Sequence, residues 1–335
     1  MDWRWRLEEL KQDKPVKVFS TFSCGGGSTM GYKRAGFEVI GNVEIDPAIN
    51  RMYVANHHPK YNFLMDLRDF NQLEGLPDEL FGLDILDGSP PCSTFSMAGS
   101  REKAWGIEKQ FREGQKMQTL DDLFFVFLDT VEKLRPKVVV AENVVGLILG
   151  NAKGYVREIV RRFNEIGYAV QIFKLNAVFM DVPQKRERVF FIANRMGYPK
   201  LHLSIQHRPV YFGGVRSQEG RDVNPESQLA ARLKFVKAGD RNMSAVMQRM
   251  YGKNNNFSSV LVADNRVCNT ITSSGSYIRM ADKKLFSDSD FVGVQSFPQD
   301  YNFCGNSVQY VCGMSVPPNM MANIALELWR QWLGR

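Results

Sequence analysis

A cysteine follows two consecutive prolines just beyond a short apolar run. Residues 83–86 predict a buried strand, and Pro90-Pro91-Cys92 come shortly after it. The prolines fix φ and remove backbone donors, so the chain is held rigid as it leaves the sheet. A thiolate at such a place can act as a nucleophile. We therefore interpret Cys92 as a candidate nucleophile, although the default role of a free cysteine is that of a small buried hydrophobe.

Three consecutive glycines follow another predicted strand. The strand covers residues 16–22, and Gly25, Gly26 and Gly27 precede a helix predicted from residue 29. Such a turn lets backbone approach a ligand and points a helix N-terminus toward it. The lysine of a P-loop and a clean G-x-G-x-x-G pattern are both missing from the sequence of this loop, which disfavours a triphosphate. A tight structural turn would use the same glycines, so the loop alone leaves both readings open.

Two acidic residues stand where a nucleoside could be held. Glu44 follows the strand predicted over residues 37–43. It lies about 20 residues beyond the glycine loop, where nucleotide-binding sheets hydrogen-bond ribose hydroxyls. Asp66 follows the apolar Phe63-Leu64-Met65 and could accept from an adenine amino group. A helix N-cap or an exposed loop acid explains Asp66 equally well.

The segments that must position these residues alternate between strands and helices. Strands are predicted over residues 16–22, 37–43, 83–86, 137–141, 169–175 and 189–193, and helices over 29–35, 47–56, 120–134 and 155–166. This order predicts an α/β fold with a Rossmann-like, mostly parallel sheet and helices on both faces. Such sheets bind ligands outside the carboxyl ends of their strands. Residues 97–119 show no apolar period and predict a mobile lid.

The alternation breaks down near residue 195, and the charge changes there too. Residues 195–266 carry twelve Lys and Arg against five Asp and Glu, which accounts for the whole net charge of +7. We expect a small irregular domain over 195–266, between a first domain over 1–194 and a return to it over 267–335 with a closing helix over 319–333. The basic excess predicts contact with a polyanion, with a solvated surface as the plainer alternative. Candidate phosphate contacts are Arg208, Arg216, Arg221 and Arg241.

The bulk composition bounds the class of protein. With 44% hydrophobic and 24% charged residues the chain is typical of a globular protein. No apolar run approaches the roughly 18 residues of a membrane span, and no secretory segment is visible. We therefore expect a cytoplasmic protein without membrane association. Five cysteines without a C-x-x-C pair and four histidines make disulfides and a metal site unexpected.

Taken in order, these segments resemble the cytosine-5 DNA methyltransferase family through most of the chain. Residues 88–96, Gly-Ser-Pro-Pro-Cys-x-x-Phe-Ser, resemble its catalytic motif. Glu142-Asn143-Val144 resembles its Glu-Asn-Val motif, and residues 184–188 resemble its Gln-x-Arg-x-Arg motif. Residues 270–272, 295–298 and 313–318 match later motifs. Any one of these is weak, whereas their joint order is specific.

The resemblance implies an S-adenosylmethionine-dependent enzyme that methylates carbon 5 of cytosine in double-stranded DNA at a short specific sequence. The product would be S-adenosylhomocysteine, without a metal. A monomer in a bacterial or phage-infected cell would carry out the reaction, and residues 195–266 would recognise the target. The residues assigned to the cofactor are Phe22 (on the adenine), Ser23, Gly25, Gly26, Gly27, Glu44, Ile45, Asp66, Leu67 and Pro90. Those assigned to the substrate are Ser93, Ser96 and Gln184, beside the four arginines above.

The implied reaction explains why these residue types are needed. Carbon 5 of cytosine becomes nucleophilic when the thiolate of Cys92 adds to carbon 6. Glu142 would assist as an acid at ring nitrogen 3 while binding the amino group. Arg188 would stabilise charge on the ring oxygen, with Arg186 as a supporting member of the catalytic set. A surface salt-bridge role is the alternative for Arg186 and Arg188. The base must leave the stack to react, and residues 97–119 would assist that step.

Three positions depart from the family pattern. Cys24 replaces the first glycine of the cofactor loop, Ser93 replaces a glutamine, and Met314 replaces an asparagine. We interpret them as subfamily variation. RNA methylation is an alternative, but that branch carries a Cys-Phe-Thr insertion that this sequence lacks. A non-catalytic DNA-binding member and a small-molecule methyltransferase with a structural Cys92 are further alternatives.

Overall fold

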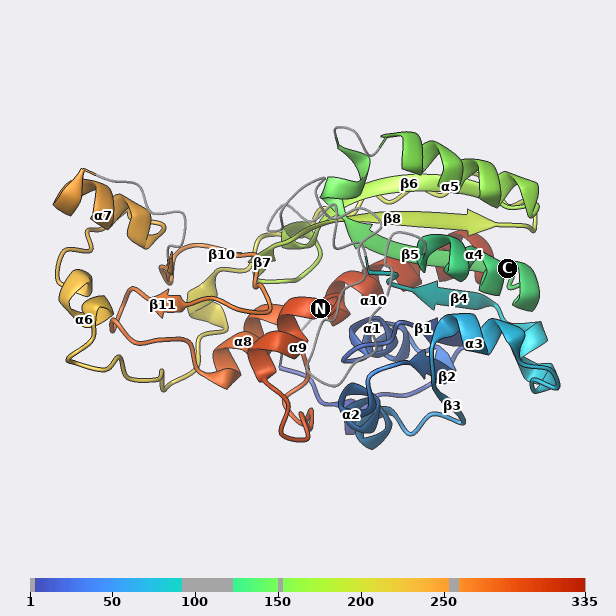
Figure 1. Ribbon diagram of the computed structural model, residues 1–335, viewed down its shortest axis with the longest axis horizontal. Helices are drawn as coiled ribbons and strands as arrows, with labels where there is room; N and C mark the ends of the chain where they lie inside the picture. The colour runs from blue at the N-terminus through green and yellow to red at the C-terminus, as the bar shows by residue number, and fades with distance from the viewer. Residues whose placement is uncertain (1–3, 92–122, 150–152, 253–258, 335) are drawn as a thin grey trace.

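The computed structural model describes residues 4–91, 123–149, 153–252 and 259–334. Cys92, Ser93, Ser96 and the stretch 97–119 therefore lie outside the described residues. Figure 1 shows a large lobe built on a sheet and a smaller lobe that carries α6 (Gln228–Leu233), α7 (Met243–Tyr251) and β11 (Tyr277–Arg279). Among the described helices, none combines the length and apolar character that a membrane crossing requires.

The large lobe is organised by a seven-stranded sheet in the order β3-β2-β1-β4-β5-β8-β6. Neighbouring strands run parallel except β8, which is antiparallel to both β5 and β6. The predicted mostly parallel α/β fold is thus confirmed. The strand bounds are β1 Lys17–Thr21, β2 Glu38–Glu44, β3 Tyr61–Leu64, β4 Ile85–Gly88, β5 Val138–Val144, β6 Ala169–Asn176 and β8 Glu187–Asn194.

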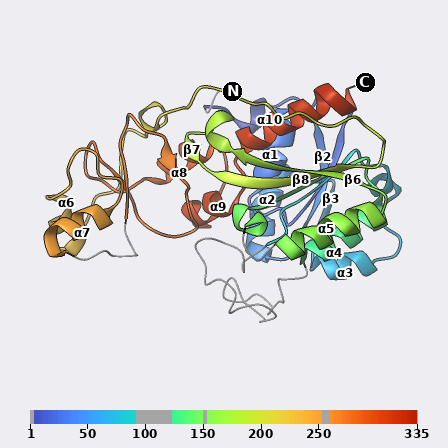
Figure 2. The same cartoon turned by 90° about the horizontal axis from the view of Figure 1, so that it is seen from above.

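Helices cover both faces of this sheet (Figure 2). α1 (Gly27–Arg34) and α10 (Pro318–Leu328) pack on one face, where Val18 and Ile85 point. α3 (Leu67–Gln72), α4 (Leu123–Leu134) and α5 (Lys153–Glu165) pack on the other, where Phe19 and Leu86 point. Successive strand residues are therefore buried on opposite sides, which is why these strands are continuous apolar runs rather than alternating ones.

Most predicted elements agree with the structure to within a few residues, but the short elements β3 and α3 of the large lobe were missed, as were the short helices and strands between β8 and α10. β3 is a four-residue edge strand whose residues are alternately half-buried and exposed, too short to give a clear period. α3 after it spans six residues. The closing helix ends as α10 at Leu328 and continues as a π-helical turn, Trp329–Leu333. α2 (Pro47–His57) closely matches its prediction.

The small lobe has its own apolar cluster and extends past the expected boundary at residue 266. Its buried core is Leu233, Met243, Val246, Leu261 and Ile278. β9 (Val260–Val262) lies before that boundary, yet it pairs in parallel with β11, which lies after it. Outside the small lobe's core, α8 (Asp288–Gln295) and α9 (Val308–Met314) pack together, and β10 (Cys268–Asn269) pairs with β7 (Gln184–Lys185).

Candidate active site

The carboxyl edge of the sheet gathers most of the predicted site residues. β1 ends at Thr21 before the glycine loop, β2 ends at Glu44, and β4 ends at Gly88 before Pro90 and Pro91. Because β8 runs antiparallel, its beginning lies at the same edge, and Arg188 pairs with Val144 of β5. Pro90 is fixed there because its carbonyl oxygen accepts a hydrogen bond from Asn143 Nδ2 at 3.1 Å. Cys92, two residues on, falls outside the described residues.

The glycine loop after β1 is held in left-handed backbone conformations. Phe22, Cys24 and Gly26 have φ of 51°, 45° and 68°. The loop closes through a 2.8 Å hydrogen bond from the Gly26 N–H to the Ser23 carbonyl. Gly26 precedes α1 without any side-chain cap, so the first amides of α1 remain available to an anionic ligand group.

The glycines are required by close packing against the protein itself. A Cβ at Gly25 would lie 2.5 Å from Val311, and one at Gly27 would lie 2.1 Å from the Val316 carbonyl oxygen. At Gly26 it would lie 2.2 Å from Nε2 of the buried His57. Any side chain at these positions would therefore clash with the protein, which explains the glycines as residues of a tight turn. The backbone amides of the same loop can still face a ligand.

Glu44 ties the end of β2 to the glycine loop. One carboxylate oxygen accepts from the Cys24 amide at 2.9 Å, and the other accepts from the amides of Ile45 and Asp46 at 2.9 and 3.0 Å. Burial raises the pKa of Glu44, while the three backbone donors act in the opposite direction. The carboxylate is therefore fixed in orientation at the place where the sequence predicted a ribose contact.

Asp66 and Leu67 lie next to this edge but have structural roles as well. Asp66 caps α3 by accepting from the Arg68 amide at 2.8 Å and pairs with the Arg68 guanidinium at 3.2 Å. Leu67 is only 4% exposed and packs in the core. The N-cap explanation of Asp66 is thus realised in the structure.

Glu142 and Arg188 form a largely buried ion pair. Arg188 Nε lies 2.8 Å from Glu142 Oε1, and the side chains of Arg188 and Glu142 are 15% and 12% exposed, respectively. Burial lowers the pKa of Arg188, and the neighbouring Glu142 carboxylate partly offsets this. The pair presents a carboxylate and a guanidinium side by side, a combination suited to a planar ring with both donors and acceptors.

Arg186 and Gln184 point into the protein instead. The buried Arg186 guanidinium donates to the carbonyl oxygens of Ile271, Gly313 and Ser315 at 3.0, 2.8 and 3.1 Å. Gln184 donates to Gln295 Oε1 at 2.6 Å and accepts from the Ile271 amide at 2.9 Å. These two side chains join β7 to the later motifs.

Asp87 is a buried acid that the sequence analysis did not assign to the site. It is 2% exposed near the end of β4 and accepts from Ser20 Oγ at 3.0 Å and from the Tyr32 hydroxyl at 3.1 Å. Burial raises its pKa to about 7. The available signal was an acid inside the apolar run Ile85-Leu86-Asp87, where a hydrophobe is the usual residue.

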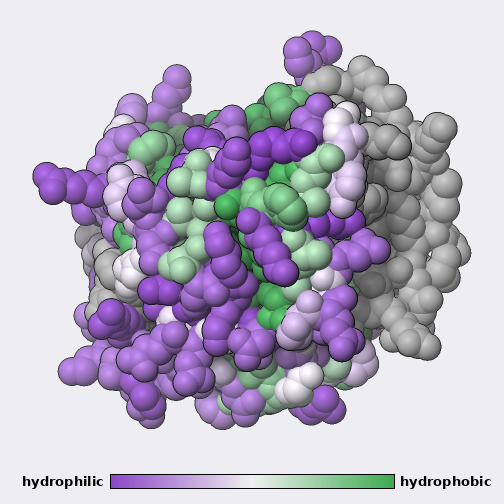
Figure 3. Space-filling model, turned by 90° about the vertical axis from the view of Figure 1, so that its left-hand side faces the viewer, coloured by the Kyte–Doolittle hydropathy of each residue, from purple (hydrophilic) through white to green (hydrophobic). Residues whose placement is uncertain are grey.

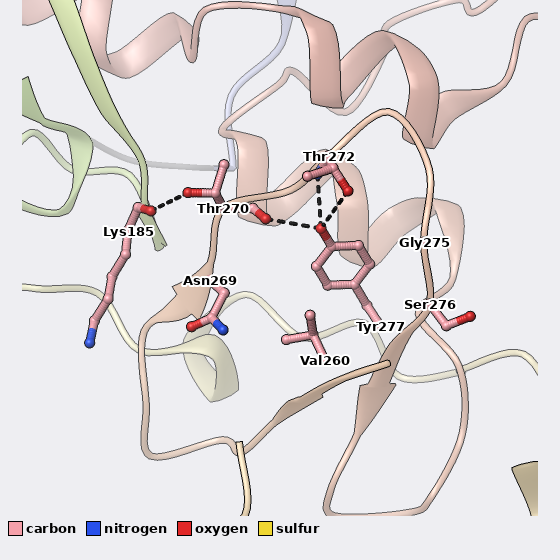
Figure 4. A pocket seen from close by; sticks show the side chains of 8 residues that line it. All are labelled: Lys185, Val260, Asn269, Thr270, Thr272, Gly275, Ser276 and Tyr277. Atoms are coloured by element: carbon pink, nitrogen blue, oxygen red, sulfur yellow. Dashed lines mark hydrogen bonds between the residues drawn. The ribbon is translucent and has the colours of Figure 1, made fainter. Parts of the chain in front are cut away.

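A hollow of about 410 Å³ lies where the two lobes meet (Figure 4). Lys185 and Thr270 line one side, and Ser276 and Tyr277 line the other. A second hollow of about 520 Å³ also includes Lys185 and is lined by Arg241 from the small lobe. Polar and basic side chains from both lobes thus face shared space at this junction.

The four candidate arginines differ in their surroundings. Arg216 pairs with Asp264 at 3.3 Å, and Arg221 donates to the Phe286 carbonyl at 2.7 Å. Arg208, Arg221 and Arg241 are exposed, and Arg216 is half-buried. Seen from its free end, the small lobe is hydrophilic around a central apolar strip (Figure 3).

Known proteins match the chain along nearly its whole length. Residues 16–330 match the family described as C-5 cytosine-specific DNA methylase. Type II methyltransferase M1.HphI of Haemophilus parahaemolyticus is 30% identical over 91% of this chain and 84% of its own length. Type II methyltransferase M.Sau96I of Staphylococcus aureus is 28% identical over 96% of this chain and 77% of its own length.

Solved structures agree on the fold. A putative DNA modification methyltransferase encoded within an E. coli prophage superimposes with a TM-score of 0.68 at 19% identity, covering 96% of this chain and all of that chain (100%). DNMT2 of Spodoptera frugiperda superimposes with a TM-score of 0.62 at 18% identity, covering 94% of this chain and 99% of that one. Because the family match spans residues 16–330, the chain belongs to the C-5 cytosine-specific DNA methylase family, and it is a DNA cytosine-5 methyltransferase that uses S-adenosylmethionine.

Proposed function

We propose that the chain methylates carbon 5 of a flipped cytosine in double-stranded DNA, with Cys92 as nucleophile and the Glu142–Arg188 pair holding the base. The observation that carries this proposal is the 2.8 Å ion pair at the sheet edge where the Pro90-Pro91 segment also begins. A carboxyl and a guanidinium at that edge match the N3–amino side and the ring oxygen of cytosine, respectively.

Each residue then has a defined task. The Cys92 thiolate adds to carbon 6, Glu142 brings a proton to nitrogen 3, and Arg188 stabilises charge on the ring oxygen. Bound S-adenosylmethionine supplies the methyl group, leaving S-adenosylhomocysteine. Transfer of the carbon 5 proton to a water molecule, return of the nitrogen 3 proton to Glu142 and elimination of the Cys92 thiolate complete the cycle. Arg186 contributes indirectly, because its three carbonyl partners fix β7 and the loops beside it.

The donor set at the edge fits the cofactor. The uncapped first amides of α1 suit its carboxylate, and Glu44 suits the ribose hydroxyls. Phe22 and Asp66 remain the proposed adenine contacts. The other proposed cofactor contacts are Ser23, Gly25, Gly26, Gly27, Ile45, Leu67 and Pro90.

The small lobe would bind DNA phosphates chiefly through basic side chains that form no ion pair with an acidic residue in the part of the chain that the structure describes. The structure ties Arg216 and Arg221 to protein acceptors. We therefore assign phosphate contact first to Arg208, Arg241 and Lys185, whose side chains face solvent or the junction hollows. We propose a monomer, in a bacterial or phage-infected cytoplasm, that protects a short sequence within a restriction-modification system. Ser93, Ser96 and Gln184 stay proposed substrate contacts.

A trapping experiment tests the nucleophile directly. A mixed-sequence duplex in which 5-fluorocytosine replaces cytosine is incubated with S-adenosylmethionine and protein. Fluorine at carbon 5 cannot leave as a proton does, so the covalent adduct accumulates and survives denaturing electrophoresis. We expect an adduct with the wild type and with Cys304→Ala, and none with Cys92→Ala. An adduct with Cys92→Ala would remove Cys92 from the mechanism.

A further inference from the structure

Asp87 is the residue before the last one of β4, close to the point where the glycine loop leaves β1 and the segment leading to Pro90 leaves β4. In the β1–β4 pairing Asp87 is opposite Ser20, and Gly88 is opposite Thr21. The glycine loop begins directly after Thr21, and the segment leading to Pro90 begins directly after Gly88. Asp87 thus lies one residue before the point where each of these segments leaves the sheet.

The groups around Asp87 are neutral donors and other acids. Ser20 of β1 and Tyr32 of α1 donate hydroxyl hydrogen bonds to its carboxylate at 3.0 and 3.1 Å. Glu142 of β5 acts on it as a like charge, and burial, together with the charge of Asp87, raises the pKa of Tyr53 of α2. Glu142 is itself paired with Arg188 of β8 at 2.8 Å.

A cation bound near Asp87 would stabilise the ionised form of its carboxyl group. Burial raises the pKa of Asp87 to about 7, so the carboxyl is divided between its neutral and ionised forms near neutral pH. A nearby positive charge favours the ionised form, and the attraction is strong because the site is poorly solvated. The bound cofactor carries such a charge on its sulfonium sulfur, whereas the sulfur of the product is neutral.

Methyl transfer at the proposed site would bring that sulfur to the strand ends next to Asp87. The proposed cofactor loop leaves β1 and the nucleophile segment leaves β4, and these two strands are direct neighbours. A methyl group passing from a ligand on the first segment to a base on the second must cross the space between the two strand ends. That space lies just outside the Ser20–Asp87 pair.

We propose that Asp87 makes the cofactor site prefer the positively charged methyl donor over its neutral product. The inference rests on the proposed cofactor site at this sheet edge. Its consequence for turnover is that methyl transfer removes the charge that Asp87 attracts, so that the product is released more readily than the donor.

Calorimetric titration of the full chain with S-adenosylmethionine and with S-adenosylhomocysteine tests the proposal. A drop of one unit in the pKa of Asp87 on binding corresponds to about a tenfold gain in affinity. With a drop from about 7 to about 6, we expect the affinity ratio of donor to product to rise about fivefold between pH 6 and pH 8 in the wild type. In Asp87→Asn the ratio should stay near its low-pH value. The variant also corrects for titration of the ligands' own amino groups.

Proton release gives a second readout that does not depend on activity. Titrations at pH 7 in buffers of different ionisation enthalpy count the protons released. The wild type should release roughly half a proton more than Asp87→Asn with the donor, and no more than the variant with the product, because a group near its pKa is about half protonated. In Tyr32→Phe, loss of a donor to the ionised form should move the pH midpoint of the ratio upward.

The outcomes separate this inference from the proposed function. Equal ratios and equal proton release in wild type and Asp87→Asn would overturn the role of Asp87, as would equal weakening of both ligands. If Asp87→Asn does not fold, an unshifted midpoint in Tyr32→Phe overturns it instead. Failure of the wild type to bind either ligand would contradict the cofactor site itself.

Discussion

Breaking the Glu142–Arg188 pair should destabilise the protein more than removing both of its charges together. The charged atoms are 2.8 Å apart in side chains that are 12% and 15% exposed. At an effective dielectric constant of about 20, this distance gives about 6 kcal/mol of attraction, most of which desolvation offsets. Either single variant, Glu142→Gln or Arg188→Met, leaves one buried charge without its partner. We expect each to lower the free energy of unfolding by about 3 kcal/mol.

A double-mutant cycle measures the interaction. Urea unfolding of the wild type, both single variants and Glu142→Gln/Arg188→Met should give a double variant that is at least about 2 kcal/mol more stable than the summed single losses imply. A cycle at the exposed pair Arg161–Glu158, with side chains 61% and 52% exposed, is the control and should show far smaller coupling. Additivity at Glu142 and Arg188 to within about 0.5 kcal/mol would refute the pairing on which the base-binding site is built.

Three further predictions concern the parts around that pair. Arg186→Lys should lower the free energy of unfolding by about 2 kcal/mol, because an ammonium cannot reach three carbonyl oxygens in the fork geometry; an unchanged urea midpoint would contradict this. Gly26→Ala should both destabilise the protein and weaken S-adenosylmethionine binding, since its new methyl group would lie 2.2 Å from a buried imidazole. Gly75→Ala has the same φ of 68° but open space, so it should show only the backbone cost of about 1 kcal/mol in thermal unfolding. Arg241→Ala should reduce the slope of log DNA affinity against log salt by about one, and Arg216→Ala should reduce it less; equal slopes would contradict the assignment.

The sequence predicted the sheet because its central strands are buried on both faces. Runs such as Val138-Val139-Val140 can be recognised without knowledge of their partners. β3 was missed because an edge strand with one open side carries little apolar signal. The small lobe was placed by composition alone, and its extent was not predictable because β9 and β11 pair across an intervening strand and loops.

The candidate site was predictable as a set of positions, and its internal geometry was not. Order along the chain predicted that Glu44 and Glu142 share one edge, because parallel strands end together. Arg188 reaches that edge because it lies at the start of the antiparallel strand β8. Arg186 turns inward because it binds the carbonyl oxygens of Ile271 and Ser315, whereas Arg188, two residues later, faces the edge. These carbonyl partners are distant in sequence, so the difference was not predictable. The raised pKa of Asp87 could be recognised only from the structure, because it results from burial of the carboxyl group.

The most direct test of the central claim follows a methyl group. Wild type and Cys92→Ala are incubated with methyl-labelled S-adenosylmethionine and mixed-sequence duplex DNA, and the product is read by conversion sequencing. The account predicts label at carbon 5 of cytosine within one short sequence for the wild type, and no label for Cys92→Ala. A folded wild type that binds the cofactor yet leaves the DNA unlabelled would contradict it, and so would label transferred equally by Cys92→Ala.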